Sequence, residues 1–292
     1  MRQPLMTSER CLLFVGAHPD DESFGLGGTL AHYALAGAQV FYACATRGDV
    51  GAAAPEHLAG HATVGDMRWA ELQCAAQALG LAGLIHLGYR DSGMPGSPDN
   101  TALGALAAAP ENEVVERVVQ VLRERRPQVV LTFDPIGGYK HPDHIAIHKA
   151  TVKAFHAAGD AAQFPAAGPA WQPQKLYFHV FPKGMLKLAV RLLPLFGRDP
   201  RKFGNNGDID IADLARYEFP THALVSIEPA AARAKQAASA CHQSQLAGGP
   251  AARGLVGWLS RLAAQRDAYM RAWPAPRPGE PKEADLFAGV TA

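Results

Sequence analysis

The feature that most constrains the fold of this chain is an alternation of short apolar runs with longer helix-like segments over its first half. The run at 11–17 is continuous and stops at His-Pro, so it predicts a buried strand rather than a long helix. Further strands are expected at 39–45, 83–87 and 128–133, and helices at 24–37, 63–81, 112–126 and 142–158. Strands that alternate with helices indicate βαβ units, so we expect an α/β fold: a Rossmann-like, open, mostly parallel sheet with helices on both faces.

The pattern becomes less regular after residue 158. We expect strands at 175–181 and 225–227, and helices at 185–196, 229–245 and 255–272. Four prolines within 273–282 predict an extended segment. The expected organisation is a single α/β domain over 1–272, with its chemistry in 11–158, a less regular segment at 159–222 and a closing strand and helices at 223–272, followed by an extended C-terminal arm at 273–292.

The composition restricts the partners and the compartment that we expect. The 28 basic and 27 acidic side chains leave a formal net charge of +1, which argues against a nucleic-acid partner. No apolar stretch approaches the roughly 18 residues of a membrane span, so we expect no stable membrane insertion, and the N-terminus lacks the pattern of a secretory signal. The cysteines form no CxxC pair and predict buried free thiols at Cys11, Cys44, Cys74 and Cys241. We therefore expect a cytoplasmic protein.

Two polar segments follow expected strands, at the edge of the sheet where open parallel sheets bind their ligands. The first is GAHPDDE at 16–22, and the second is GGYKHPDH at 137–144. Turns and helix caps explain the prolines and an acid, but they do not require several imidazoles and carboxylates. His18, Asp21 and His144 together form a two-histidine, one-carboxylate set that is typical of catalytic zinc sites, and iron(II) or cobalt would accept the same donors.

The neighbouring carboxylate, Asp20, cannot point the same way as Asp21 in a tight turn. It is therefore free to face a metal-bound water, where a carboxylate serves as a general base. His148 lies four residues after His144 and could join it on one face of a helix, but we expect it to support or pack against the site rather than to bind the metal.

The paired segments resemble the LmbE/PIG-L family of zinc-dependent de-N-acetylases, which includes deacetylases of N-acetylglucosaminyl-phosphatidylinositol and of the sugar precursors of mycothiol and bacillithiol. Further segments carry the resemblance: TRGD at 46–49, RWAEL at 68–72, GYRDSGM at 88–94, and Lys235 with HQSQ at 242–245. The matches run from about residue 11 to residue 245, and the stretch 181–222 matches none of the family's motifs.

The resemblance implies a role for each residue of the expected site. His18, Asp21 and His144 match metal ligands and Asp20 matches the general base. Protonated His141 matches the group that polarises the substrate carbonyl, with Asp143 orienting it. Arg68 and Asp91 match residues that hold the sugar, Tyr139 matches a tyrosine over the site, and Arg47 either contacts substrate or braces its loop. The implied reaction removes an acyl group, with acetyl expected, from the amide nitrogen of a small N-acylated amino sugar or glucosaminyl conjugate.

Other functions use similar residues. An amidase of a thiol or antibiotic conjugate would share the metal centre, and a non-catalytic sugar-binding protein would share the fold. A metal-dependent phosphoesterase would need further carboxylates for a second metal. A dinucleotide-binding enzyme would extend the GLGG segment at 25–28 with a glycine at position 30, where this chain has Leu30. The sequence leaves open the acylated substrate, the native metal, the role of 181–222 and the oligomeric state, a homo-oligomer included.

Overall fold

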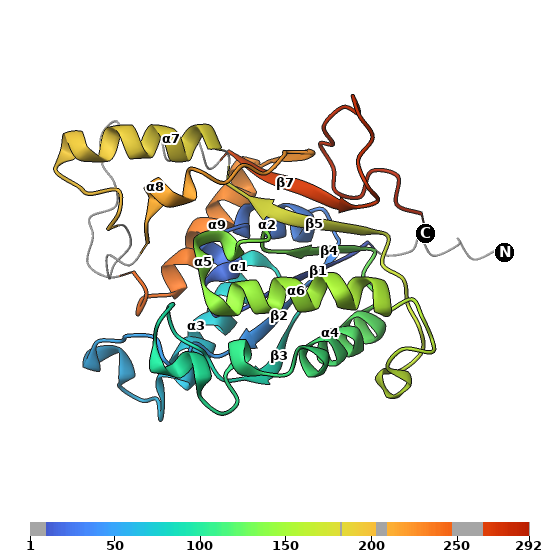
Figure 1. The fold of residues 1–292 in the computed structure, drawn as a ribbon, viewed down its shortest axis with the longest axis horizontal. Helices are drawn as coiled ribbons and strands as arrows, with labels where there is room; N and C mark the ends of the chain where they lie inside the picture. Colours follow the sequence, from blue (N-terminus) through green and yellow to red (C-terminus); the bar gives the residue numbers. More distant parts are fainter. Residues whose placement is uncertain (1–9, 182, 203–208, 247–264, 292) are drawn as a thin grey trace.

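The computed structural model describes residues 10–181, 183–202, 209–246 and 265–291, which form a seven-stranded mixed sheet covered by helices (Figure 1). The sheet order is β3-β2-β1-β4-β5-β7-β6. The strands are β1 (Cys11–Gly16), β2 (Gln39–Thr46), β3 (Gly83–Tyr89), β4 (Val129–Thr132), β5 (Lys175–Val180), β6 (Ala223–Ser226) and β7 (Arg266–Trp273). Strands β1 to β5 pair in parallel, whereas β7 is antiparallel to both β5 and β6. The expected α/β fold with a mostly parallel sheet is confirmed.

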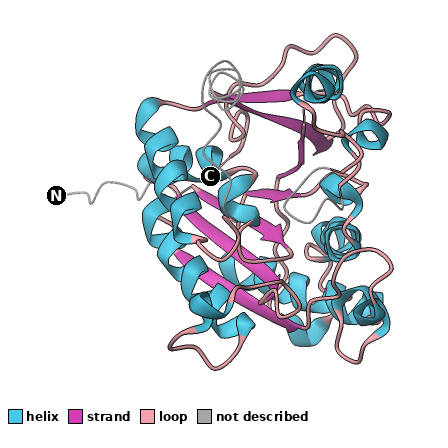
Figure 2. Cartoon of the chain, turned by 90° about the vertical axis from the view of Figure 1, so that its left-hand side faces the viewer, coloured by secondary structure: helices cyan, strands magenta, loops and turns pink. Residues whose placement is uncertain are grey.

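Helices cover both faces of the sheet (Figure 2). The α-helices are α1 (Asp21–Phe24), α2 (Gly27–Leu35), α3 (Val64–Leu79), α4 (Glu111–Arg125), α5 (Gly137–Lys140), α6 (Pro142–Ala157), α7 (Lys183–Leu192), α8 (Ile211–Leu214) and α9 (Pro229–Cys241). Short 3-10 turns lie at Pro55–Leu58, Pro98–Thr101, Leu106–Ala108, Pro165–Ala167 and Leu193–Phe196. α2, α3 and α9 pack against one another, and α4 packs against α6. The chain order reverses between β3 and β4, so β1 and β4 lie side by side and the loops that follow them share one crevice.

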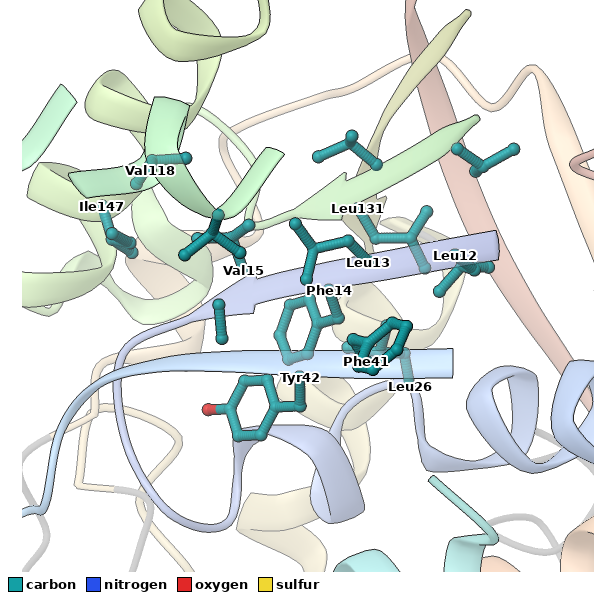
Figure 3. Close-up of a cluster of buried hydrophobic side chains, with 14 of the residues drawn as sticks. Leu12, Leu13, Phe14, Val15, Leu26, Phe41, Tyr42, Val118, Leu131 and Ile147 are labelled. Carbon is teal, nitrogen blue, oxygen red and sulfur yellow. The ribbon is translucent and has the colours of Figure 1, made fainter. Parts of the chain in front are cut away.

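The core that positions this crevice is centred on β1, which is buried along its whole length (Figure 3). Phe14 stacks on Tyr42 of β2 with ring centroids 5.0 Å apart, and both side chains are fully buried. The Tyr42 hydroxyl donates a hydrogen bond to the carbonyl oxygen of His18 at 2.6 Å. The turn after β1 is therefore tied directly to the apolar interior.

Two expected helices differ from the structure. The helix expected at 24–37 is the shorter α2, Gly27–Leu35, and Gly25 and Leu26 separate it from α1, which ends at Phe24. The helix expected at 255–272 is wrong at its end, where Arg266–Trp273 forms β7; residues 255–264 lie outside the described residues. Hydrogen bonding to β5 on one side and β6 on the other outweighs the helix propensity of Ala268, Met270 and Arg271.

The C-terminal segment is less detached than the extended arm that we expect at 273–292. Leu286 and Phe287 are buried in the main core. Glu283 accepts hydrogen bonds from Lys175 of β5 at 2.5 Å and from Arg271 of β7 at 2.7 Å. Apolar burial and this buried ion network fold the segment back onto the sheet.

The cysteines divide into two pairs of different kinds. Cys11 and Cys44 are buried free thiols, as expected. The same expectation is wrong for Cys74 and Cys241, which form a disulfide with their Cα atoms 5.8 Å apart. The two residues are 167 positions apart in sequence, so no local spacing could have indicated the pairing. The bond joins α3 to the end of α9.

The membrane expectation can be examined for the described residues. Within these ranges we find no helix with both the length and the apolar character that crossing a membrane requires.

Candidate metal and catalytic site

The turn after β1 is held by its own carboxylate. Asp21 Oδ2 accepts hydrogen bonds from the backbone N–H groups of Ala17 at 3.0 Å and His18 at 2.7 Å. Asp20 has φ 118°, a left-handed conformation that side chains rarely adopt and that costs on the order of 1–3 kcal/mol. Strain of this kind persists only where the surrounding contacts fix the backbone. The turn therefore separates the directions of the two adjacent carboxylates.

The second segment presents its histidines from the start of α6. His141 is the N-cap residue, and its Nδ1 accepts the backbone N–H of Asp143 at 3.2 Å. Pro142 occupies the first helical position, where its missing N–H costs nothing. Because α6 begins here, the ring centroids of His141 and His144 lie 5.1 Å apart, and both side chains are buried.

The structure brings the three expected metal ligands together. His18 Nδ1 lies 3.2 Å from His144 Nε2, and Asp21 oxygens lie 3.3 Å from His144 Nε2 and 3.9 Å from His18 Nδ1. Two ligand atoms that each lie about 2.1 Å from one tetrahedral metal are about 3.4 Å apart. The two distances to His144 Nε2 match this value, and the distance from His18 Nδ1 to Asp21 Oδ2 is longer. The ring nitrogens of His18, His141 and His144 also lie within 4.8 Å of one another. A buried group that could hold a metal ion is therefore present.

The carboxylate of Asp143 contacts His18, whereas we expect Asp143 to orient His141. Its Oδ2 lies 3.0 Å from His18 Nε2 and accepts the Ser92 backbone N–H at 2.9 Å, while the Ser92 hydroxyl donates to Oδ1. Burial opposes the charged form of His18, but its hydrogen bonds to Asp143 and Asp91 outweigh burial and raise its pKa well above the ordinary value. A carboxylate on the far nitrogen of a ligating histidine fixes the orientation of the ring. The Asp143 carboxylate is thus hydrogen-bonded to His18, and its backbone N–H donates to His141.

The surroundings of His141 favour its neutral form over the protonated form that we expect. Burial, together with the nearby rings of His18 and His144, lowers its pKa to about 2. Because Nδ1 accepts the Asp143 N–H, the ring proton of neutral His141 lies on Nε2. His141 can therefore donate one hydrogen bond without carrying a charge.

Asp20 is held by Arg68 from α3. Arg68 Nη2 donates to Asp20 Oδ2 at 3.0 Å and to the Pro19 carbonyl at 2.7 Å, and Nη1 donates to the Gly48 carbonyl at 3.2 Å. Gly48 has φ +68°, and a Cβ there would lie 2.0 Å from Arg68 Nη1. Burial raises the pKa of Asp20 to about 7, with the Arg68 charge opposing the rise. Arg68 therefore supports the carboxylate through the contacts seen here.

The other residues that we expect to bind substrate do not all lie at the cluster. Asp91 is buried near His18 Nε2 at 3.6 Å, and it also accepts the N–H groups of Gly93 at 2.8 Å and Val50 at 3.3 Å. The ring centroids of Tyr139 and His144 lie 4.9 Å apart. Arg47 instead pairs with Asp66 at 2.9 Å and its contacts are with α3. Asp91 and Tyr139 thus line the cluster, while Arg47 links the loop after β2 to α3.

His148 contributes to packing around the cluster. Its Nδ1 bonds the Phe133 carbonyl at 2.8 Å, and its ring lies against Phe178 with centroids 4.6 Å apart. This agrees with the supporting role expected for it.

Sequence reasoning about the site missed Glu22 and His242. Both side chains are 0% exposed, and Glu22 Oε1 lies 2.7 Å from His242 Nε2. Two signals were available, because Glu22 directly follows the HPDD segment and His242 begins the HQSQ match. Neither signal shows that residues 220 positions apart in the chain contact each other.

Comparison with known proteins places this arrangement in a family. Residues 13–155 match the family model described as PIG-L: GlcNAc-PI de-N-acetylase. A protein of Geodermatophilus obscurus named 1D-myo-inositol 2-acetamido-2-deoxy-alpha-D-glucopyranoside deacetylase is 40% identical over 250 residues, covering 82% of this chain and 84% of its own. A protein of the same name from Streptomyces avermitilis is 38% identical over 298 residues, covering 97% and 98%.

A solved structure shares the fold. The N,N'-diacetylchitobiose deacetylase of Pyrococcus horikoshii matches with a TM-score of 0.59 and 18% identity, covering 97% of this chain and 87% of its own. The two sequence matches, which cover most of this chain, establish the relationship. The chain belongs to the PIG-L family of de-N-acetylases.

Proposed function

We propose that this protein is a metal-dependent hydrolase that removes the acetyl group from the amide nitrogen of an N-acetylglucosaminyl conjugate of inositol. The observation that carries the proposal is the convergence of His18, Asp21 and His144 beside a separate carboxylate, Asp20. The substrate follows from the names of the two relatives, which cover most of this chain.

The metal would be held by His18 Nδ1, an Asp21 oxygen and His144 Nε2, and we propose zinc because nitrogen and carboxylate donors suit it. A metal bound at such a site supplies a water nucleophile at neutral pH and polarises the substrate carbonyl. Asp143 and Ser92 hold the ring of His18 in the orientation that this requires. The two histidines are buried and the Asp21 side chain is 8% exposed, so the three donors are largely shielded from bulk water.

Asp20 is proposed as the general base. A base works best when its pKa lies near the working pH, and burial raises the pKa of Asp20 to about 7. Its carboxylate takes the proton that the attacking water loses and returns it to the leaving amine nitrogen. Arg68 keeps the carboxylate in place for both transfers.

His141 is proposed to stabilise the charge that develops on the carbonyl oxygen. Its Nε2–H is the free donor, since Nδ1 already accepts the Asp143 N–H. A neutral donor of this kind keeps its proton throughout turnover, so the proton does not have to be replaced. Tyr139, with its ring 5.8 Å from that of His141, covers the same side of the cluster.

For substrate binding, we propose that Asp91 accepts a hydroxyl of the sugar. Each of its oxygens accepts one backbone N–H, and a carboxylate oxygen can accept more than one hydrogen bond. Arg68 is proposed to act on the sugar only through the turn that it supports. Arg47 is proposed to brace the loop after β2 and not to touch the substrate.

The cytoplasmic location stays a prediction. Disulfides are rare in reducing compartments, so the Cys74–Cys241 bond is the observation that stands against it. Alkylation of free thiols in protein isolated under acid quench would show which state the pair has in cells.

Amine release tests the proposed function. Metal-loaded protein is incubated with N-acetylglucosaminyl-inositol, and the free amine and acetate are measured in parallel. We expect equimolar amine and acetate, loss of both after chelation, and recovery on adding zinc. Absence of amine release from the fully metal-loaded protein would contradict the proposal.

A further inference from the structure

A buried pair lies behind the proposed general base and takes no part in the mechanism above. Glu22 and His242 are both 0% exposed, and Glu22 Oε1 lies 2.7 Å from His242 Nε2. The hydrogen bond to Glu22, acting against burial, raises the pKa of His242. Charged groups that lie out of water need a partner with good geometry, and each of these residues supplies one for the other.

The second oxygen of Glu22 reaches the main chain of Asp20. Oε2 accepts the Asp20 backbone N–H at 3.0 Å, and the Ser23 hydroxyl donates to Oε1 at 2.5 Å. The chain of contacts therefore runs from His242 through Glu22 to the residue whose φ is 118°. A backbone in that conformation depends on outside contacts to keep it there.

The carboxylate of Asp20 is held from another helix. Arg68 of α3 donates to Oδ2 at 3.0 Å and to the preceding carbonyl of Pro19 at 2.7 Å. Asp20 thus has two supports: α3 holds its carboxylate, and the residue that follows α9 holds its backbone through Glu22.

Two contacts fix these supports to each other. The disulfide joins Cys74, on the same helix as Arg68, to Cys241, the residue directly before His242. Beyond it, Glu71 of α3 accepts the backbone N–H of Ser244 at 2.8 Å and its hydroxyl at 2.7 Å. The end of α9 is therefore attached to α3 on either side of His242.

We propose that His242 is a positioning residue for Asp20, acting through Glu22, and that the Cys74–Cys241 disulfide holds it in place. The proposal rests on the proposed function, because it assigns a purpose to the placement of the base. Cys74 is exposed, so a small dithiol can reach the bond. The dithiol gives up two electrons and two protons as it closes into its own disulfide, and Cys74 and Cys241 become thiols.

The first test compares His242→Leu with the conservative His242→Gln, which keeps a side-chain N–H donor for Glu22. A misplacement of about 1 Å can lower a rate by about 10²-fold, so we expect kcat of His242→Leu to fall by about 10- to 100-fold. KM and bound metal should stay close to the wild-type values, and His242→Gln should recover most of the rate.

His222→Leu is the matched control. His222 is a half-buried histidine at the β6–β7 edge of the sheet, and its side chain accepts a hydrogen bond from the Arg271 backbone N–H at 3.1 Å. Its kcat should match that of wild type. Unchanged kcat in His242→Leu, equal losses in His242→Leu and His242→Gln, or an equal loss in His222→Leu would each overturn the positioning role.

The second test uses dithiothreitol. Reduction should lower the kcat of the wild type severalfold and reoxidation should restore it, with KM unchanged. Without treatment, the Cys74→Ser, Cys241→Ser double variant should have the low kcat of the reduced wild type, and dithiothreitol should not lower it further. The double variant therefore also controls for chelation of the metal by the dithiol. Full activity of the reduced enzyme would overturn the role of the disulfide. If the wild-type protein releases no amine, both the proposed function and the positioning role are overturned. If the wild type is active and His242→Leu has the same kcat, only the positioning role is overturned.

Discussion

Replacement of Asp143 separates the role that the structure gives this residue from the role that the sequence suggests. The carboxylate accepts hydrogen bonds from His18 Nε2, the Ser92 N–H and the Ser92 hydroxyl. Asp143→Asn can keep the first two bonds with its amide oxygen, and Ser92 can reorient its hydroxyl to accept from the amide nitrogen. Asp143→Ala removes all three bonds and leaves three buried donors without this partner.

The size of the effect follows from these contacts. Removing the partner of a ligating histidine weakens metal binding by about 10- to 100-fold, or about 1.4–2.7 kcal/mol. Asp143→Asn loses only the negative charge and should lie near the tenfold end, whereas Asp143→Ala loses charge and geometry and should lie near the hundredfold end. Each unsatisfied donor in Asp143→Ala also costs about 1–3 kcal/mol of folding free energy, which thermal unfolding of the metal-free protein measures separately.

The assay is competition between the protein and a chromophoric zinc chelator. Graded weakening, with Asp143→Ala below Asp143→Asn below wild type, is the expected result. If both variants bind zinc as tightly as wild type but lose kcat, then Asp143 acts on His141, as the sequence suggested, and our assignment to His18 is wrong.

Three further predictions concern protons and specificity. Asp20→Asn should keep the metal and lose about 10²- to 10⁴-fold in kcat. The pKa of Asp20 is raised to about 7, and its carboxylate forms as the pH rises, so wild-type kcat should rise with pH and then level off. The midpoint should lie at or below about 7, because a bound cation lowers the pKa of Asp20. A profile of kcat that does not rise with pH in this way would contradict the assignment of Asp20 as the base. His141→Ala should lose about 10²- to 10³-fold in kcat at constant metal content, measured by single turnover. Asp91→Ala should lower kcat/KM far more for the sugar substrate than for a minimal acetamide. Equal losses on the two substrates would mean that Asp91 binds no hydroxyl of the sugar.

The site residues near strand ends could be predicted because their placement is set locally. An apolar run that ends at His-Pro makes a strand and a turn, and a histidine before Pro142 makes a helix cap. The chain order then brings the loops after β1 and β4 together, since their strands are neighbours in the sheet. The convergence of His18, Asp21 and His144 follows from these two facts.

The features that could not be predicted depend on contacts between distant parts of the chain. β7 is a strand because β5 and β6 flank it, and its own sequence is compatible with a helix. The Cys74–Cys241 bond and the Glu22–His242 pair span 167 and 220 positions. Spacing places Asp143 beside His141, whereas the contact of its carboxylate with His18 joins residues 125 positions apart.

The measurement that tests the central claim most directly is zinc-dependent amine release in His144→Ala beside His148→Ala. Both residues are buried histidines on α6, but only His144 lies among the converging donors. After chelation and zinc titration, wild type and His148→Ala should each bind a single ion per chain and release amine from N-acetylglucosaminyl-inositol. His144→Ala should bind little zinc and release almost none. Full zinc content and full activity in His144→Ala would contradict the account.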